Sequence, residues 1–164
     1  MATETAIGHD MSQGWERYQD LLIRAITPLT PEQLSYRTAP HLRNVDETCR
    51  HVIGARARWC QFALALADPA LPTLGQWDAK DMPARTSAEL ADGLRATWAV
   101  LQSALETWTP ADLAQTIPNT APEPGEPDFY SRHWVIWHLI EHDLHHGGEI
   151  TEIIGAQGVP GVDV

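Results

Sequence analysis

Four segments of the chain repeat apolar residues every three or four positions, which is the spacing of an amphipathic helix. They cover about residues 10–27, 44–66, 86–108 and 128–154 of the 164. No segment alternates apolar and polar residues for long enough to predict a sheet. The predicted fold class is therefore all-α. Because 43% of the residues are apolar, we expect one domain, residues 1–164, built around one core.

The connections between these segments are long and rich in proline. They span residues 27–43, 67–85 and 109–127, whereas simple up-down bundles use roughly 2–8 residues. The sequence thus predicts a four-helix bundle with long crossover connections. Thr30 and Thr109 are each followed by proline, which predicts a short helical turn in two of them. The stretch "PNTAPEPGEPDFY", residues 118–130, fits a lid over a site or a solvated connector, and both interpretations stay open.

Charge and hydropathy narrow the classes of partner. The formal net charge is −11, and the 11 basic residues are scattered, so we expect no nucleic-acid partner. No stretch approaches the roughly 20 apolar residues of a membrane span, and the start of the chain lacks the pattern of a secretion signal. We therefore expect a soluble, cytoplasmic protein. Cys49 and Cys60 are eleven positions apart in one helix, which predicts free thiols.

The most unusual stretch is "WHLIEHDLHHGGEI", residues 137–150, with four histidines and three carboxylates. At 100° per residue, the apolar residues of this segment define one inward face. His142 and His146 fall inside that face, whereas His138 and His145 lie on its flank. Two imidazoles spaced i and i+4 can bind one metal ion. A pair of hydrogen-bonded core histidines, or a surface accident, is the alternative.

A metal site needs a third ligand, and His51 is the candidate because it lies at the edge of the inward face of the second helical segment. Cys49 and Cys60 lie on the opposite side of that helix and are poor ligand candidates. Three histidines would leave one coordination position open for water or substrate, which is typical of a catalytic zinc site.

These residues resemble the DinB/YfiT-like family of metal-dependent enzymes. The stretch "HDLHHGGE" is similar to the family pattern His-x-x-x-His-Arg-Gly-Gln, and "CRHVIGARARW" places His51 at the family's first ligand position. The resemblance implies a divalent metal on His51, His142 and His146: zinc first, with nickel, iron or manganese as alternatives. Gly147 replaces the arginine of the pattern and Glu149 replaces the glutamine. Glu149 is a candidate catalytic base, extra ligand or partner of a ligand, and a solvent-facing role is equally open.

The resemblance implies several functions without choosing between them. We expect a small-molecule substrate and favour a transferase that uses a low-molecular-weight thiol such as bacillithiol or mycothiol. A metal-dependent hydrolase is the first alternative, and a non-catalytic metal-binding protein of the stress response is the second. A homodimer is expected from the habit of the family. A third alternative is a metal-free dimerising module that uses an apolar stripe on the second helix, made of Cys49, Ile53, Cys60 and Leu64.

Overall fold

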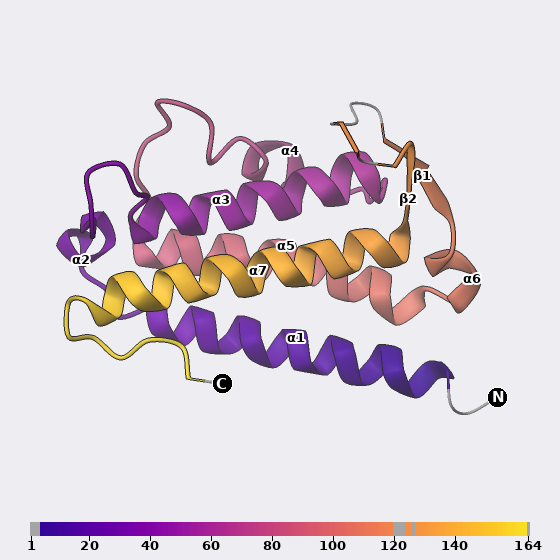
Figure 1. Cartoon of the computed structure of the whole chain (residues 1–164), viewed down its shortest axis with the longest axis horizontal. Coiled ribbons are helices and arrows are strands. Elements are labelled where there is room, and N and C mark those ends of the chain that lie inside the picture. The colour runs from indigo at the N-terminus through magenta and orange to yellow at the C-terminus, as the bar shows by residue number, and fades with distance from the viewer. Residues whose placement is uncertain (1–3, 120–123, 126, 164) are drawn as a thin grey trace.

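The structure is a computed structural model that describes the backbone of residues 4–119, 124–125 and 127–163, and side chains from Met11 onward within these ranges. Four long helices dominate it: α1 (Glu4–Ile26), α3 (Val45–Arg58), α5 (Ser87–Thr107) and α7 (Arg132–Gly155). They lie side by side as a bundle (Figure 1). The prediction of an all-α four-helix bundle is confirmed, with boundaries close to those that the periodicity predicts.

Local side-chain hydrogen bonds fix where these helices begin. Asn44 accepts from the amide of Glu47 at the start of α3, and the Glu47 side chain accepts from the Asn44 amide in return. Such reciprocal pairs satisfy amides that have no partner inside the helix. Thr86 caps α5 in the same way. Thr30 and Thr109 cap the short helices α2 (Pro31–Ser35) and α6 (Pro110–Leu113), so the predicted helical turns are present.

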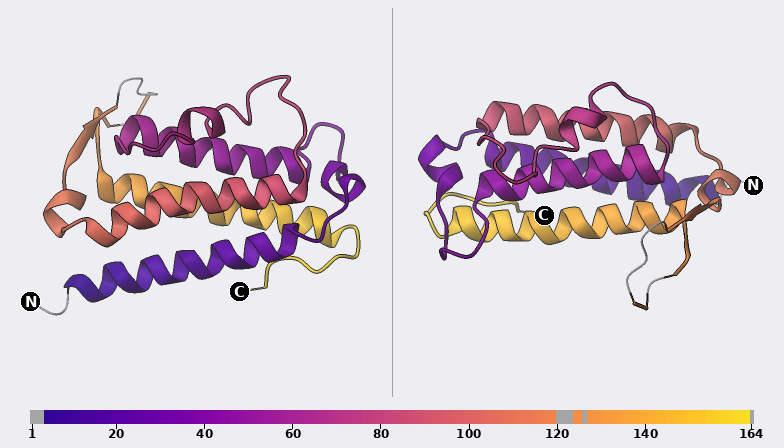
Figure 2. Two further views of the ribbon diagram at one scale, coloured as in Figure 1. Left: turned by 180° about the vertical axis from the view of Figure 1, so that it is seen from behind. Right: turned by 90° about the horizontal axis from the view of Figure 1, so that it is seen from above.

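The connection between α3 and α5 is a crossover. It returns along the bundle, so that α3 and α5 run in the same direction while α1 and α7 run the opposite way (Figures 1 and 2). This connection contains the short helix α4 (Leu71–Leu74). The crossover brings residues of the 67–85 segment back over α3, and this placement matters for the site described below.

A two-stranded hairpin precedes α7. Strand β1 (Thr116–Pro118) pairs antiparallel with β2 (Phe129–Ser131), and Ile117 lies opposite Tyr130. Strands of three residues are too short to show an alternating pattern, which explains why the sequence does not predict them. The hairpin closes one end of the bundle against the start of α7 (Figure 1).

The stripe on α3 that could have served a dimer is part of the core instead. Cys49, Ile53, Cys60 and Leu64 are at most 1% exposed. The prediction of a second, outer face is wrong because α3 packs against α7 on one side and α5 on another. A helix enclosed in this way buries nearly its whole circumference. No helix within the described ranges has the length and apolar character to cross a membrane.

The end of α3 departs from α-helical geometry. Residues Trp59–Ala63 form one turn of π-helix, η1, and such turns often accompany functional sites. The repeat of Val52, Ala55 and Trp59 at spacings of three and four predicts Phe62 as the next inward residue, but its side chain is 72% exposed. That assignment is wrong because the wider π turn changes the direction in which the residues after Arg58 point.

Candidate metal centre

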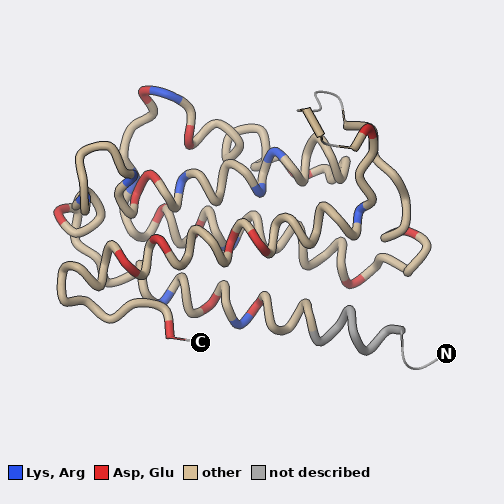
Figure 3. Tube along the Cα trace, viewed as in Figure 1, with Lys and Arg blue, Asp and Glu red and all other residues tan. Residues whose placement is uncertain are grey.

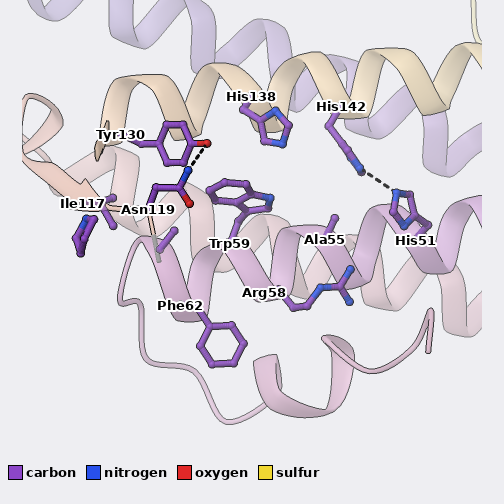
Figure 4. Close-up of a pocket in the computed structure, with 12 residues that line it drawn as sticks. His51, Ala55, Arg58, Trp59, Phe62, Ile117, Asn119, Tyr130, His138 and His142 are labelled. Atoms are coloured by element: carbon purple, nitrogen blue, oxygen red, sulfur yellow. Dashed lines mark hydrogen bonds between the residues drawn. The ribbon is translucent and has the colours of Figure 1, made fainter. Parts of the chain in front are cut away.

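Three histidines meet where α3 packs against α7. His51 comes from α3 and His142 and His146 from α7, and one ring nitrogen of each lies within 4.8 Å of the other two. The Nε2 atoms of His51 and His142 are 3.2 Å apart and face each other (Figure 4). The ring centre of His146 is 4.8 Å from that of His51 and 4.4 Å from that of His142. The three side chains predicted as ligands are therefore brought together.

Asp78 fixes the orientation of the first of these rings. Its carboxylate lies 3.0 Å from Nδ1 of His51 and also accepts hydrogen bonds from Arg58, at 2.6 and 2.9 Å. When Nδ1–H of His51 donates its hydrogen bond to the carboxylate, Nε2 presents its lone pair to the other histidines. Asp78 belongs to the crossover segment, and nothing in its local sequence distinguishes it from other loop aspartates.

The close approach of Asp78 depends on a glycine. A Cβ atom on Gly54 would lie 2.6 Å from an oxygen of Asp78 and 2.9 Å from the Arg58 guanidinium, which is closer than any real Cβ contact. Gly54 follows His51 by three positions on α3, so it leaves a notch beside the histidine. The carboxylate of Asp78 occupies that notch.

Glu149 plays the corresponding part for His146. Its carboxylate lies 2.7 Å from Nδ1 of His146, which leaves Nε2 of that ring as the available acceptor. The second oxygen of Glu149 lies 3.3 Å from His145, whose side chain is 67% exposed. Glu149 is thus a neighbour of a predicted ligand, and its predicted role as a catalytic base stays a prediction.

Burial disfavours the charged forms of His51 and His142. Desolvation, together with the neighbouring His146 and His51, lowers the pKa of His142 to about 3. Desolvation also lowers the pKa of His51, although its hydrogen bond to Asp78 acts in the opposite direction. Burial raises the pKa of Asp78, but the hydrogen bonds from Arg58 and His51 outweigh it and hold that pKa below its usual range. His51 and His142 are therefore favoured in the neutral form that binds metal.

The residues present fit a bound cation. Nε2 of His51 and Nε2 of His142 are 3.2 Å apart, which allows a hydrogen bond between the rings without metal and is also close to the separation of two nitrogen ligands on one tetrahedral zinc ion. Two of the three histidines place their other nitrogen against a carboxylate, the arrangement that orients metal-binding histidines. Nδ1 of His142 is buried without a hydrogen-bond partner among the described atoms. The donor set of three imidazoles suits zinc and the neighbouring transition metals.

Tyr18 occupies the space beside Gly147, the position where the family pattern has arginine. A Cβ atom on Gly147 would lie 1.9 Å from the Tyr18 hydroxyl oxygen. The hydroxyl approaches the carbonyl oxygen of Leu144, at 3.5 Å. No side chain of any kind fits at residue 147 while Tyr18 is in place, and this accounts for the departure from the pattern.

A cavity of about 410 Å³ opens beside His51 and His142. It lies between the α3–η1 segment and the start of α7 (Figure 4). His138, predicted to be an ordinary flank residue, lines it, whereas Glu149 and His145 do not. The remaining described lining residues are mostly apolar or aromatic: Ala55, Arg58, Trp59, Phe62, Ala63, Ile117, Pro118, Asn119 and Tyr130.

The ends of the 118–130 segment form one wall of this cavity. Asn119 donates a hydrogen bond from Nδ2 to the Tyr130 hydroxyl, at 2.9 Å, and so ties the two ends together (Figure 4). Residues 120–123 and 126 lie outside the described residues. The segment therefore reaches the candidate site at its ends, and its interpretation as a lid stays a prediction.

A second polar cluster lies between the same two helices. Arg56 of α3 donates to both oxygens of Asp143 of α7, with a shortest distance of 2.6 Å, and both side chains are 0% exposed. Trp15 donates to the same carboxylate at 2.6 Å, and Gln19 accepts from Arg56 at 2.5 Å. Outside this pair, charged residues are spread over helices and loops, and lysine and arginine form no continuous group in the described part (Figure 3).

Comparisons with known proteins identify the family and the fold. A family model described as the DinB superfamily matches residues 15–150. A DinB-like protein from Bacillus cereus is 24% identical, with a TM-score of 0.66 and 93% of each chain covered. A DinB-like protein from Bacillus subtilis is 12% identical, with a TM-score of 0.66 over 94% of this chain and 96% of the other. A conserved protein from Enterococcus faecalis is 15% identical, with a TM-score of 0.64 and the same coverage. These three structures show the shared fold. No curated protein sequence matches.

Proposed function

The chain belongs to the DinB superfamily, and on that premise we propose that it is a metal-dependent enzyme that transfers a low-molecular-weight thiol to a small molecule. His51, His142 and His146 would hold the metal, and the cavity beside them would receive the substrates. A divalent cation held there supplies Lewis acidity, which favours the deprotonated form of a thiol or a water molecule that reaches it.

The protein's own residues orient the ligands and shape the site. Asp78 and Glu149 hold the rings of His51 and His146 in the tautomer that leaves Nε2 available. The aromatic and aliphatic walls of the cavity lower the local polarity and limit the access of water. In the proposed transfer, the thiol sulfur bonds to an electrophilic carbon, the leaving group departs with its electron pair, and the thiol proton passes to water.

The observation that favours a thiol over a hydrolysed bond is the lining of the cavity. No carboxylate is among the described residues that line it, and Glu149 lies elsewhere, against His146. A hydrolase commonly uses a carboxylate or a histidine as a general base, and His138, the lining histidine that is not a predicted ligand, is held between Trp134 and Trp59. An unperturbed thiol has a pKa near 8.5, against about 15.7 for water, so it requires less help from a base. This difference supports thiol transfer.

Metal analysis tests the centre itself. Protein purified without a histidine tag should carry close to one metal ion per chain, whereas His51→Ala, His142→Ala and His146→Ala should carry almost none. His133→Ala is the matched control, because His133 is exposed on the same helix and its loss should leave the metal content unchanged. Metal-free wild type, or full retention in all three variants, contradicts the proposal.

An activity assay tests the reaction. Metal-loaded protein is mixed with 1-chloro-2,4-dinitrobenzene and, in turn, bacillithiol, mycothiol or glutathione, and the thioether product is followed by its absorbance. We expect the product with at least one thiol and none in the three histidine variants. Cleavage of an aryl ester without any thiol would instead favour the hydrolase. Bound metal with neither activity would favour the non-catalytic alternative.

A further inference from the structure

Half of the described lining residues carry aromatic rings, and Trp134, which is not itself a lining residue, stacks on two of them, Tyr130 and His138. Tyr130 and Trp134 stack with ring centres 4.0 Å apart and planes 16° apart. Trp134 and His138 continue the stack at 5.1 Å and 8°. The ring of Trp59 meets Tyr130 and His138 at steep angles, at 6.1 and 5.0 Å. An ordered set of rings therefore extends from the hairpin towards His142 along α7.

This set is held in place before any ligand arrives. Tyr130 is 7% exposed, and its hydroxyl is bonded to Asn119. His138 is held between Trp134 and Trp59. Rings fixed in this way lose little conformational freedom when a ligand lies against them. The wall is therefore a preformed surface for stacking.

Phe62 adds an apolar ring on the opposite side of the opening. Its side chain is 72% exposed but lines the cavity, and it points away from the bundle core (Figure 4). The π turn, which separates Phe62 from the inward stripe of α3, provides this position. A large ring exposed beside a cavity gains hydrophobic contact when a ligand covers it.

The charge of the lining disfavours cations. Arg58 carries the one formal charge among the described lining residues. Its guanidinium donates to Asp78 and to the Gly75 carbonyl, at 2.6 Å each, and is therefore fixed near the opening. A cation would stack favourably on the rings, but the described lining residues offer no carboxylate to pair with it, and Asp78, the nearest carboxylate that Arg58 contacts, is already paired with that guanidinium. The lining fits an uncharged flat molecule.

We propose that this cavity binds a flat, uncharged aromatic molecule, which is the electrophilic substrate of the thiol transfer. The assignment as substrate rests on the proposed function, whereas the binding itself depends on the rings alone. The volume of about 410 Å³ lies within the range of about 300–1,000 Å³ for small-molecule sites.

Calorimetric titration with three naphthalene-sized probes tests the ligand class. 2-Naphthol is flat and uncharged, decahydro-2-naphthol has the same skeleton without aromatic faces, and 2-naphthyltrimethylammonium is flat and cationic. We expect 2-naphthol to bind at least about tenfold more tightly than either of the others, both in metal-free and in metal-loaded protein. No binding of 2-naphthol, or equal affinity for the saturated or the cationic probe, overturns the proposal.

Substitutions of lining residues test whether 2-naphthol binds at the proposed surface. Phe62→Leu and Trp59→Leu each replace a ring by an aliphatic side chain, and each should weaken 2-naphthol binding roughly 2- to 13-fold. Trp137→Leu is the matched control, because Trp137 is 54% exposed on α7 and does not line the cavity. An equal loss in Trp137→Leu, or no loss in Phe62→Leu, overturns the proposal. Circular dichroism verifies the fold of Trp59→Leu, and Phe62→Leu changes an exposed side chain only.

The two proposals fail differently. If thiol transfer is wrong, metal-loaded protein forms no thioether while 2-naphthol still distinguishes wild type from Phe62→Leu. If the aromatic site is wrong, the three probes bind alike while the metal content and the thiol reaction are retained.

Discussion

Two polar clusters lie between α3 and α7, and their chemistry differs. At Arg56 and Asp143, both side chains are fully buried and the guanidinium and carboxylate are bonded to each other and to Gln19 and Trp15. At the three histidines, Nε2 of His51 faces Nε2 of His142 beside a cavity, and Nδ1 of His142 has no described partner. Asp143 is adjacent in sequence to His142, so one helix serves both clusters on different faces.

The Arg56–Asp143 cluster has the properties of a structural cluster, whereas the histidine cluster has those of a binding site. A buried ion pair whose hydrogen bonds are satisfied within the protein holds two helices together and has nothing left to offer a ligand. Three imidazoles that converge beside a cavity, two of them oriented by carboxylates, can still take up a cation. We therefore expect the first cluster to hold the two helices together and the second to bind a cation.

The largest expected effect follows from removal of one partner of the ion pair. Asp143→Ala leaves the Arg56 guanidinium charged and buried, which should lower the free energy of unfolding by about 3–5 kcal/mol. Urea denaturation of metal-free protein measures it. Because the pair holds α3 against α7, the same variant should also bind metal poorly.

A double variant is the control for this effect. Arg56→Met combined with Asp143→Leu removes both charges and keeps apolar volume, so it should recover most of the lost stability. A double variant as unstable as Asp143→Ala would mean that volume and the contacts to Trp15 and Gln19, rather than the unpaired charge, cause the loss.

The sequence predicts the parts of this molecule that depend on local pattern. Helical periodicity and capping residues such as Asn44 and Thr86 predict the bundle, because both act within one or two turns. The helical wheel places His142 and His146 on one face for the same reason. His51 required a second observation, its position on the inward side of another helix.

Features that depend on distant packing are not predictable in this way. Asp78 reaches His51 only because the crossover returns over α3 and Gly54 leaves room. Arg56 is a charged residue within the stretch that carries the stripe Cys49–Leu64, so its local sequence does not predict burial. It is nevertheless part of the core, because it pairs with Asp143, 87 positions later. The π turn at Trp59–Ala63 likewise reverses the assignment of Phe62.

The second expected effect is stabilisation of the protein by metal, which should depend on the three histidines and not on the Arg56–Asp143 pair. Addition of zinc to metal-free protein at 100 times its dissociation constant should raise the free energy of unfolding by about 2.7 kcal/mol. His146→Ala should show no rise, whereas His133→Ala should respond like wild type. Thermal denaturation with and without zinc, reversed by a chelator, provides the measurement. An equal rise in His146→Ala would place the zinc elsewhere.

The third expected effect is a loss of metal affinity when Asp78, the carboxylate that orients His51, is changed. Asp78→Asn keeps the shape of the side chain but accepts a weaker hydrogen bond, so metal affinity should fall about 10- to 100-fold. Gly54→Ala should act similarly, because a methyl group displaces the same carboxylate. Competition with a chelating dye measures the affinity.

Asp81→Asn is the control, because Asp81 is an exposed residue of the same connection. Its affinity for metal should equal that of wild type. An equal loss in Asp81→Asn would contradict the role of Asp78.

The smallest effect is the pH dependence of the metal-free protein. In the folded state the pKa of His142 is about 3, and its ordinary value is 6.5, so the unfolded chain binds the proton more tightly. The stability linked to this group is complete above about pH 6.5 and is lost progressively as the pH falls towards 3. Wild type should therefore lose more stability between about pH 7 and pH 5 than His142→Asn, as measured by urea midpoints at both values. The remaining titrating groups are present in both proteins, so the difference reports on the histidine cluster. Equal losses would mean that the cluster already carries a proton in the folded state, and the contrast with the charged Arg56–Asp143 pair would then no longer hold.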